Sequence, residues 1–227
     1  MESCFDNKVV SLVLTCKRPY YEKRLQQNMG SFRILQGAGT VLVYLYADPA
    51  LSETSVESNN DGSYIMKVPC IETYDYLSKK ISLAYQYFNK TKCVGVLKVD
   101  DDTSIKSETI MKSELIALAN KYDYFGVSEK EILKRDGLLK YNSRAKIADP
   151  VFQNIYHKIN YNIKYYEGPF YYLSKRAMGI VCDAGIELLF EDVGIGYILV
   201  AIPDLKTHLW KNMFEKEVYW NEKLREI

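Results

Sequence analysis

The stretch VGVLKVDDD, residues 94–102, decides the fold, because a short apolar run ends abruptly in three aspartates. The β-branched residues up to Val99 predict a buried strand. Adjacent carboxylates repel one another, so clustering them stabilises a fold only when they share a partner. Side chains alternate along a strand, so we expect Asp100 and Asp102 to point one way and Asp101 the other. Two carboxylates at the carboxyl end of a central strand predict a site for a hard divalent cation, with a solvated acidic turn as the alternative.

One kind of cation site is excluded by the spacing. An EF-hand calcium loop that starts at Asp100 would need glycine and glutamate where the chain has Ile105 and Met111. A calcium loop of this kind is therefore not expected.

Length and composition are those of an ordinary globular protein. The chain has 227 residues, enough for one large domain, of which 48% are hydrophobic and 26% charged. A net charge of +1 gives no electrostatic case for wrapping nucleic acid, so no nucleic-acid partner is expected. No apolar run approaches the roughly 20 residues of a transmembrane segment. The acidic, polar stretch 1–6 is unlike a signal peptide.

The five cysteines indicate a reducing compartment. Their number is odd, their spacings are wide and no C-x-x-C pair occurs, which argues against both a disulfide framework and a zinc site. We therefore expect mostly buried, reduced thiols in a cytoplasmic or otherwise soluble intracellular protein. A soluble protein of this kind, rich in lysine, asparagine and isoleucine, would suit a bacterium or a large DNA virus.

Strand-like and helix-like segments alternate over the first half of the chain. Apolar, β-branched runs predict strands at 8–15, 40–46, 64–68, 94–99 and 122–127. Apolar residues at helical spacing predict helices at 20–32, 73–88 and 107–121, the last capped by Ser107. A polar loop is expected at 52–63. This alternation predicts an α/β fold with a mostly parallel sheet.

The second half has a less regular pattern. We expect a loop or irregular strands at 128–149, a strand-like segment at 161–173, short helices at 174–184 and 191–201, and a terminal helix at 214–227. No internal repeat and no linker divides the chain, so a single domain over residues 1–227 is expected.

Three further segments accompany the aspartates in a fixed order. ETYDYLSKK (72–80) precedes them, and EGPFYYLS (167–174) and EDVGIG (191–196) follow. Together with LKVDDD, these segments resemble the β-1,3-galactosyltransferase and Fringe family of glycosyltransferases. That family shows D-x-Y-x-N-L-T-x-K, K-x-D-D-D, G-G-G-Y-x-L-S and E-D-V-x-x-G. Each segment alone is weak, but four in order across residues 72–200 are specific.

The resemblance implies a GT-A fold, in which a Rossmann-like, mostly parallel central sheet is flanked by helices and joined to a smaller acceptor-side part. Residues 1–127 would form the nucleotide-sugar half, and residues 128–227 the acceptor-binding half. The implied activity is that of a hexosyltransferase (EC 2.4) in glycan biosynthesis and protein glycosylation. It would transfer a sugar with inversion from a UDP-sugar to a hydroxyl of a glycan or glycoprotein, with Mn²⁺ or Mg²⁺.

The resemblance also assigns the central roles. In the D-x-D motif, Asp102 would bind the metal directly, Asp100 would contact the metal or the donor ribose, and Asp101 would orient the donor. A divalent ion that bridges both phosphates would neutralise the leaving group. Asp192 stands where the family keeps the base that takes the proton from the acceptor hydroxyl. Glu191 is the fallback base, and capping of a helix by both residues is the structural alternative.

Weaker assignments extend the site. His208 falls about where a third metal ligand follows the E-D helix, although a lone histidine is as often structural. Thr15 and Arg18, at the end of the first strand, would lie beside the nucleoside and phosphate. Asp48, at the end of the second strand, is a further nucleoside candidate. Lys79 matches the lysine of the upstream segment and would help to hold the donor, with a solvated helix lysine as the alternative.

The chain departs from the family at two positions that shape the substrate pocket. The glycine triplet is reduced to Gly168, which would lie beneath the donor sugar, and the asparagine of the upstream segment is Tyr76. The sugar preferences of the family therefore do not transfer to this chain.

Two other functions fit the same residues. A catalytically inactive relative would bind glycans or scaffold a partner, but it has no reason to keep both the D-x-D aspartates and Asp192. Another metal-dependent nucleotide-transferring enzyme, such as a nucleotidyltransferase, would also use paired aspartates. It does not require the E-D-V-x-x-G segment.

Overall fold

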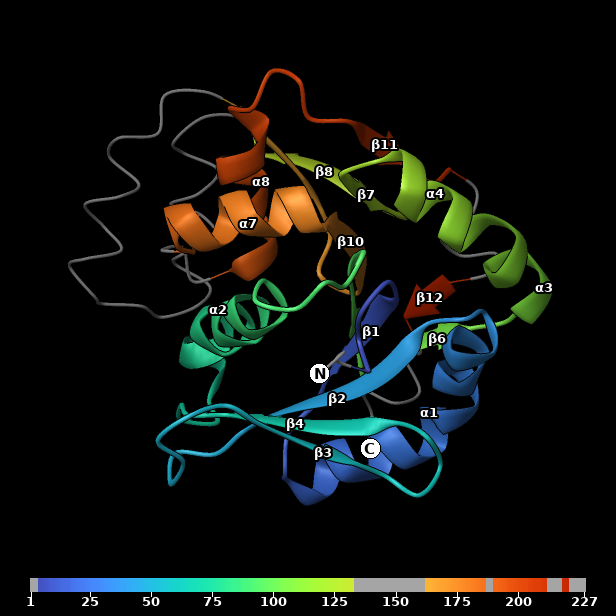
Figure 1. Ribbon diagram of the computed structural model, residues 1–227, viewed down its shortest axis with the longest axis vertical. Helices are drawn as coiled ribbons and strands as arrows, with labels where there is room; N and C mark the ends of the chain where they lie inside the picture. The colour runs from blue at the N-terminus through green and yellow to red at the C-terminus, as the bar shows by residue number, and fades with distance from the viewer. Residues whose placement is uncertain (1–3, 133–161, 187–189, 212–217, 221–227) are drawn as a thin grey trace.

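The computed structural model describes residues 4–132, 162–186, 190–211 and 218–220 (Figure 1). Its main sheet contains β1 (Val9–Leu14), β2 (Val41–Ala47), β3 (Ser55–Ser58), β4 (Tyr64–Val68), β5 (Gly95–Asp100), β7 (Tyr124–Gly126), β10 (Phe170–Ser174) and β11 (Thr207–Leu209). The strand order is β11-β7-β10-β5-β1-β2-β4-β3. Neighbours are parallel except where β10 meets β5 and β7, and where β3 meets β4. The expected α/β, Rossmann-like, mostly parallel sheet is confirmed.

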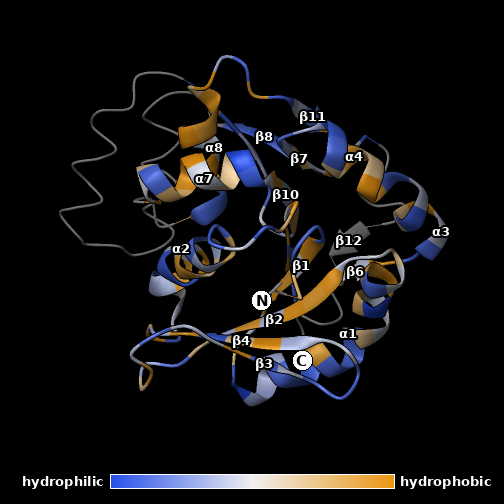
Figure 2. Ribbon diagram, in the orientation of Figure 1, coloured by the Kyte–Doolittle hydropathy of each residue, from blue (hydrophilic) through white to orange (hydrophobic). Residues whose placement is uncertain are grey.

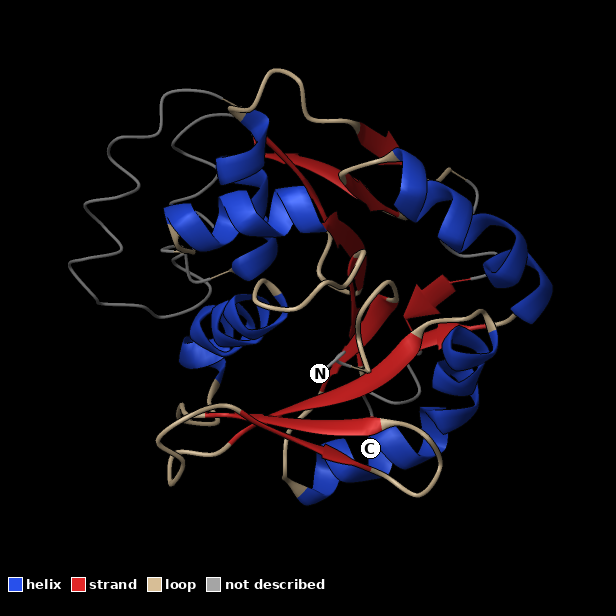
Figure 3. Cartoon of the chain, in the orientation of Figure 1, coloured by secondary structure: helices blue, strands red, loops and turns tan. Residues whose placement is uncertain are grey.

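Helices cover both faces of this sheet (Figure 3). On one face lie α1 (Pro19–Gly37), α3 (Glu108–Ile110), a π-helical turn (Met111–Leu115) and α4 (Ile116–Lys121). On the other lie α2 (Leu77–Phe88), α7 (Lys175–Ala184) and α8 (Glu191–Val200). Alternate residues of the central strands enter the two cores, so that Val13 packs on the first face and Leu12 on the second. Strands covered on both faces are apolar almost throughout, as Figure 2 shows for β1 and β2.

Two short antiparallel ribbons complete the described structure. β6 (Thr103–Ile105) pairs with β12 (Val218–Trp220), and β8 (Glu129–Ile132) pairs with β9 (Ile163–Tyr166). None of the described helices is both long and apolar enough to cross a membrane. The five cysteines are free thiols; two of them are buried, and Cys4 is exposed, so burial is less general than expected.

Most predicted elements are confirmed, and the errors have identifiable causes. The expected loop at 52–63 contains β3, a polar edge strand that turns back to β4 through Gly62 at φ 81°. An edge strand exposed to water carries no apolar alternation, so the sequence pattern gives no sign of it. The segment 161–173 forms two strands, β9 and β10, rather than one. Ser107 caps α3 as predicted, because its hydroxyl accepts a hydrogen bond from the Ile110 N–H at 3.3 Å.

Two predictions concern parts of the chain that the structure describes only partly. Of the helix expected at 214–227, the described residues 218–220 form strand β12 instead, because they pair with β6. The remainder of that helix, and the segment 128–149 beyond β8, lie outside the described residues.

Gly196, the last residue of the E-D-V-x-x-G segment, allows α8 to lie directly on β9. A Cβ at this position would stand 2.6 Å from the carbonyl oxygen of Lys164 and closer still to the Cβ of Tyr165. Only glycine permits this approach. The approach fixes the first turn of α8, where Glu191 and Asp192 lie.

We expect Gly196→Ala to lower the free energy of unfolding by about 1–3 kcal/mol, because the added methyl group overpacks the contact of α8 with β9. Gly30→Ala is the matched control, since Gly30 lies exposed in α1 with nothing within 4 Å of an added Cβ. This control should stabilise the protein by about 0.5–1 kcal/mol. Urea unfolding measures both variants, and equal effects would contradict the close packing of α8.

Candidate functional site

The candidate site lies where the two central parallel strands end. Leu14 at the end of β1 is opposite Asp100 at the end of β5, and the sheet continues through β2 on one side and β10 on the other. Open α/β sheets bind ligands in the crevice at such a switch in strand order. A pocket of about 280 Å³ occupies this position. It is lined by the end of β1, the starts of α1 and α2, and the aspartates 100–102.

Arg24 and Lys98 divide the three aspartates between them. Arg24, on α1, places Nη2 2.6 Å from Oδ1 of Asp101 and 2.7 Å from Oδ2 of Asp102. Asp100 instead faces Lys98, with Nζ 2.6 Å from Oδ1. The prediction that Asp100 and Asp102 point to one side and Asp101 to the other is therefore wrong. β5 ends at Asp100, and the next two residues form a turn in which strand alternation no longer applies.

Helix α1 also holds the backbone of this turn. Asn28, one helical turn after Arg24, donates from Nδ2 to the carbonyl of Asp101 at 3.3 Å and of Thr103 at 2.5 Å. The Thr103 hydroxyl donates to the carbonyl of Pro169 at 2.9 Å. The aspartate turn is thus fixed from two sides by contacts that do not involve its carboxylates.

The carboxylates are crowded and short of positive charge. Burial raises the pKa of Asp101 to about 7; Arg24 opposes the rise, and the two neighbouring aspartates add to it. Burial likewise raises the pKa of Asp100 to about 6, against the effect of Lys98. Among the described residues, no donor of good geometry reaches Oδ2 of Asp101, which is buried. A further cation at this turn would therefore stabilise the ionised carboxylates.

The donor set fits a metal ion that is shared with a substrate. No three His, Cys, Asp or Glu side chains gather into a ready-made metal site within the described part of the chain. Mg²⁺ in nucleotide enzymes is typically held by one or two carboxylates together with substrate phosphates and water. Asp100 and Asp102 match that pattern. They would hold the ion together with the phosphates of a bound nucleotide.

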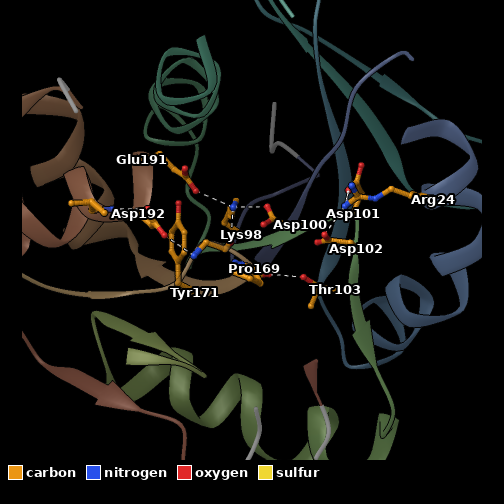
Figure 4. A network of polar contacts seen from close by, with 12 residues as sticks. Arg24, Lys98, Asp100, Asp101, Asp102, Thr103, Pro169, Tyr171, Glu191 and Asp192 are labelled. Carbon is orange, nitrogen blue, oxygen red and sulfur yellow. Dashed lines mark hydrogen bonds and ion pairs between the residues drawn. The ribbon is translucent and has the colours of Figure 1, made fainter. Parts of the chain in front are cut away.

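Lys98 joins three of the four sequence segments (Figure 4). Its buried Nζ donates to Oδ1 of Asp100 at 2.6 Å, to the carbonyl of Gly168 at 2.5 Å and to Oε1 of Glu191 at 3.0 Å. The ring of Tyr171 lies 5.6 Å from the same ammonium. Burial alone would lower the pKa of Lys98, but the two carboxylates outweigh it and raise the pKa. Lys98 is therefore a permanent cation at the centre of the site.

Asp192 lies beside this cation at the start of α8. Its Oδ2 accepts a hydrogen bond from the Gly168 N–H at 2.9 Å, and its Oδ1 accepts one from Val193 N–H at 2.8 Å. Burial raises the pKa of Asp192 to about 7, with a further contribution from Glu191, while Lys98 and the two N–H donors oppose the rise. A carboxyl that titrates near neutral pH is suited to act as a general base.

The upstream segment contributes Lys80 and not Lys79. Lys80 is buried and donates to the carbonyl of Thr15 at 2.5 Å and to Oε1 of Glu72 at 2.7 Å. Burial lowers the pKa of Lys80, and Glu72 opposes this effect. Lys79 is exposed and lies 5.9 Å from the Tyr76 ring, in line with the solvated alternative. Adjacent helix residues point about 100° apart, so only one of the two lysines can reach the pocket.

The other predicted residues separate into two groups. Thr15 and Arg18 line the pocket, and Arg18 donates from Nη2 to the carbonyl of Glu72 at 3.1 Å. Asp48 lies outside that lining and accepts a hydrogen bond from the Ala50 N–H at 3.1 Å. Gly168 likewise meets Lys98 and Asp192 rather than the pocket wall.

His208 is not brought to the aspartates. It lies on β11, stacked on Tyr122 at 4.5 Å between ring centroids and paired with Phe125 of β7. β11 is three strands away from β5 in the sheet. Because neighbouring strands lie about 4.8 Å apart, His208 is about 14 Å from Leu97, the β5 residue at the same level of the sheet. A metal ion bound by Asp102 does not reach a ligand at that distance, so we leave His208 out of the proposed metal site.

Sequence reasoning assigned no role to three charged residues of the site: Arg24, Lys80 and Lys98. A signal existed for Lys98, because a lysine inside a buried apolar strand must have an acidic partner. A signal also existed for Lys80, since it shares the buried helical row of Ala84 and Phe88. Arg24 gave no such sign, because its role depends on how α1 docks.

Comparison with known proteins adds no family assignment. No family model matches the chain, and no curated protein matches it. One similar solved structure is CMP:2-keto-3-deoxy-manno-octonic acid synthetase complexed with CTP. The two chains are 12% identical with a TM-score of 0.46, and the aligned region covers 90% of each of them. The resemblance to the galactosyltransferase and Fringe family therefore rests on the four sequence segments.

We expect Lys98→Met to lower the free energy of unfolding by about 3–5 kcal/mol, because it leaves the buried Glu191 and the partly buried Asp100 without their cation. Burial raises the folded-state pKa of Asp100 above the unfolded value, and without the ammonium nothing from Lys98 opposes this rise. The stability of the variant is therefore highest at low pH and is lost as the pH rises. Lys79→Met, at the exposed neighbouring lysine, should change stability by less than about 0.5 kcal/mol. Urea unfolding between pH 5 and pH 8 measures both, and a loss that does not vary with pH would contradict the assignment.

Proposed function

We propose that the chain is a metal-dependent transferase that binds a nucleotide-linked sugar at the aspartate turn and transfers the sugar to an acceptor hydroxyl. One observation carries the proposal: the upstream segment and the aspartate turn line one pocket at the switch in strand order, and the other two segments are joined to the aspartate turn through Lys98. A structural acidic turn needs only a nearby cation. It does not require a second carboxylate pair, at Glu191 and Asp192, on the other side of Lys98.

The donor would lie along the ends of β1 and β5. The pocket wall there carries the guanidinium groups of Arg18 and Arg24, which match the geometry of phosphate oxygens. Asp100 and Asp102 would hold Mn²⁺ or Mg²⁺ against the diphosphate. When bound, this ion would neutralise the charge that develops on the departing nucleoside diphosphate. The choice of UDP as nucleotide and of a hexose as sugar comes from the family resemblance.

Asp192 would act as the base for the acceptor. Asp192 lies on the other side of Lys98 from the aspartate turn, next to Glu191, which accepts a hydrogen bond from Lys98 (Figure 4). An inverting displacement likewise needs its nucleophile on the side opposite the leaving group. The Gly168 N–H aims one carboxylate oxygen, and the elevated pKa places proton uptake near neutral pH. The acceptor, a glycan or glycoprotein, would then be bound mainly by the half of the chain from residue 128 onward.

Nucleotidyl transfer to a sugar is the second candidate, and one feature favours it. Lys98 lies between Asp100 of β5 and Glu191 of α8, so carboxylates from two elements flank one cationic position. Enzymes that attack a nucleoside triphosphate often hold two metal ions between carboxylates in this manner. Such an enzyme would release pyrophosphate, whereas glycosyl transfer releases the nucleoside diphosphate.

Thermal unfolding with UDP and Mn²⁺ tests the nucleotide site. Ligand at a hundred times its dissociation constant should add about 2.7 kcal/mol, or roughly 5–10 °C in melting temperature. The shift should require both components and be absent in Asp102→Asn. It should persist in the control Glu108→Gln, because Glu108 pairs with Lys112 at the surface. A wild-type protein that shows no shift with UDP, CDP, CTP or GDP would overturn the assignment and favour an inactive binding protein.

Product analysis separates the two reactions. UDP-glucose, UDP-galactose and UDP-N-acetylglucosamine would each be supplied with simple methyl glycosides, and CTP or UTP with free sugars. Release of UDP supports glycosyl transfer. Release of pyrophosphate would replace that proposal with nucleotidyl transfer.

We expect Asp192→Asn to lower kcat by roughly 10²–10⁴-fold without loss of the UDP-dependent thermal shift, because the base acts only in the chemical step. In the wild type, Asp192 must be ionised to accept a proton. kcat/KM should therefore rise with pH and level off above about pH 7. Asp183→Asn, at an exposed position on α7, is the control and should keep the wild-type rate. An Asp192→Asn variant with a normal rate would assign the base elsewhere, with Glu191 next in line.

A further inference from the structure

Arg24 occupies the carboxylates that the proposed metal would need. A single nitrogen of its guanidinium, Nη2, bridges Asp101 and Asp102 at 2.6 and 2.7 Å. The side chains of all three residues are at least nine-tenths buried. A divalent ion bound to Asp102 in this arrangement would lie next to a fixed positive charge. Arg24 therefore opposes metal binding for as long as it remains where it is.

Arg24 also belongs to the wall of the pocket in which the donor phosphates are proposed to lie. Its guanidinium is flanked by the rings of Tyr20 and Tyr21, with centroids 5.3 and 5.2 Å away. The buried Nε has no acceptor of good geometry among the described residues. A guanidinium with an unused donor at a pocket wall is suited to phosphate oxygens, which it binds in a two-pronged manner.

The aspartate turn does not depend on Arg24 for its shape. Asn28 holds its backbone through the carbonyls of Asp101 and Thr103, and Thr103 is tied to Pro169. If the guanidinium moves by one or two ångströms, the carboxylates stay in place. Helix α1 thus supplies both the exchangeable charge, at Arg24, and the permanent support one turn later, at Asn28.

We propose that Arg24 is an internal counter-ion that exchanges partners when the donor binds. In the free protein it neutralises Asp101 and Asp102; in the complex it releases Asp102 to the metal and pairs with the diphosphate. The metal ion would then bind tightly only together with the nucleotide. This inference rests on the proposed nucleotide site and adds to it an order of binding and a phosphate-binding residue.

Mn²⁺ binding without nucleotide tests the exchange directly. The free ion is counted by its electron paramagnetic resonance signal, and the full chain is compared with Arg24→Gln and with Arg33→Gln. Arg33 lies on the same helix but is exposed, so its variant removes the same charge without touching the site. We expect Arg24→Gln to bind Mn²⁺ alone about tenfold more tightly than the wild type, and Arg33→Gln to match the wild type.

UDP binding in saturating Mn²⁺ completes the test. Arg24→Gln should bind UDP about tenfold more weakly, so that Mn²⁺ and UDP assist each other less than in the wild type. Arg24→Lys gives the same comparison if the glutamine variant does not fold. The lysine ammonium is a point charge, and it cannot bind carboxylates and phosphate in the two-pronged way of the arginine guanidinium. The changes in Mn²⁺ affinity and in UDP affinity should therefore have the same direction as in Arg24→Gln but be smaller.

Each other result overturns the inference. Unchanged or weaker Mn²⁺ binding in both Arg24 variants would show that Arg24 supports the metal site rather than competing for it. Tighter Mn²⁺ binding with unchanged UDP affinity would exclude the exchange onto phosphate. Wild-type protein that binds no UDP at any Mn²⁺ concentration would overturn the nucleotide site itself. Normal UDP binding in both wild type and variants would remove only the role of Arg24.

Discussion

The structure depends on one buried ammonium group. Lys98 lies on the central strand β5, where its charge is far from water, and three acceptors from different parts of the chain compensate for the lost hydration. Removing the partners would leave a buried charge, and removing the charge would leave buried carboxylates. Lys98 therefore fixes the position of α8 and of the Gly168 turn relative to the end of β5. Because Lys98 binds both Asp100 and Glu191, the aspartate turn and the start of α8 face each other across its ammonium group.

Charge in the site is divided between two cations with different properties. Lys98 has no freedom, since its three short hydrogen bonds come from β5, the Gly168 turn and α8. Arg24 is held by the two carboxylates, by the rings of Tyr20 and Tyr21 and by a hydrogen bond with the Tyr20 side chain, and it lies at the pocket wall. One cation is thus structural and the other exchangeable. This division explains how a protein can keep a cluster of carboxylates folded without a metal ion and still offer some of them to one.

Sequence patterns predicted the elements well where burial imposes a period. β1, β2 and β5 are covered on both faces, so their apolar runs are long and clear. The polar edge strand β3 and the three-residue strands β6 and β11 are too short or too exposed to carry a pattern. The order of four weak segments predicted that distant parts of the chain lie together, and three of these segments meet at Lys98. It did not predict which lysine of the upstream pair is buried, or where His208 lies.

The sequence by itself determined the fold class and the place of the candidate site. An apolar strand followed by carboxylates, within alternating strands and helices, positions charge at the carboxyl edge of a sheet whatever the details of packing. Only the tertiary structure decided which cation each aspartate faces. Asp100 pairs along its own strand with Lys98, whereas Asp101 and Asp102 meet Arg24 from a helix more than seventy residues earlier. Such pairing depends on how α1 docks on the sheet, and no local pattern of residues encodes a contact between segments that far apart.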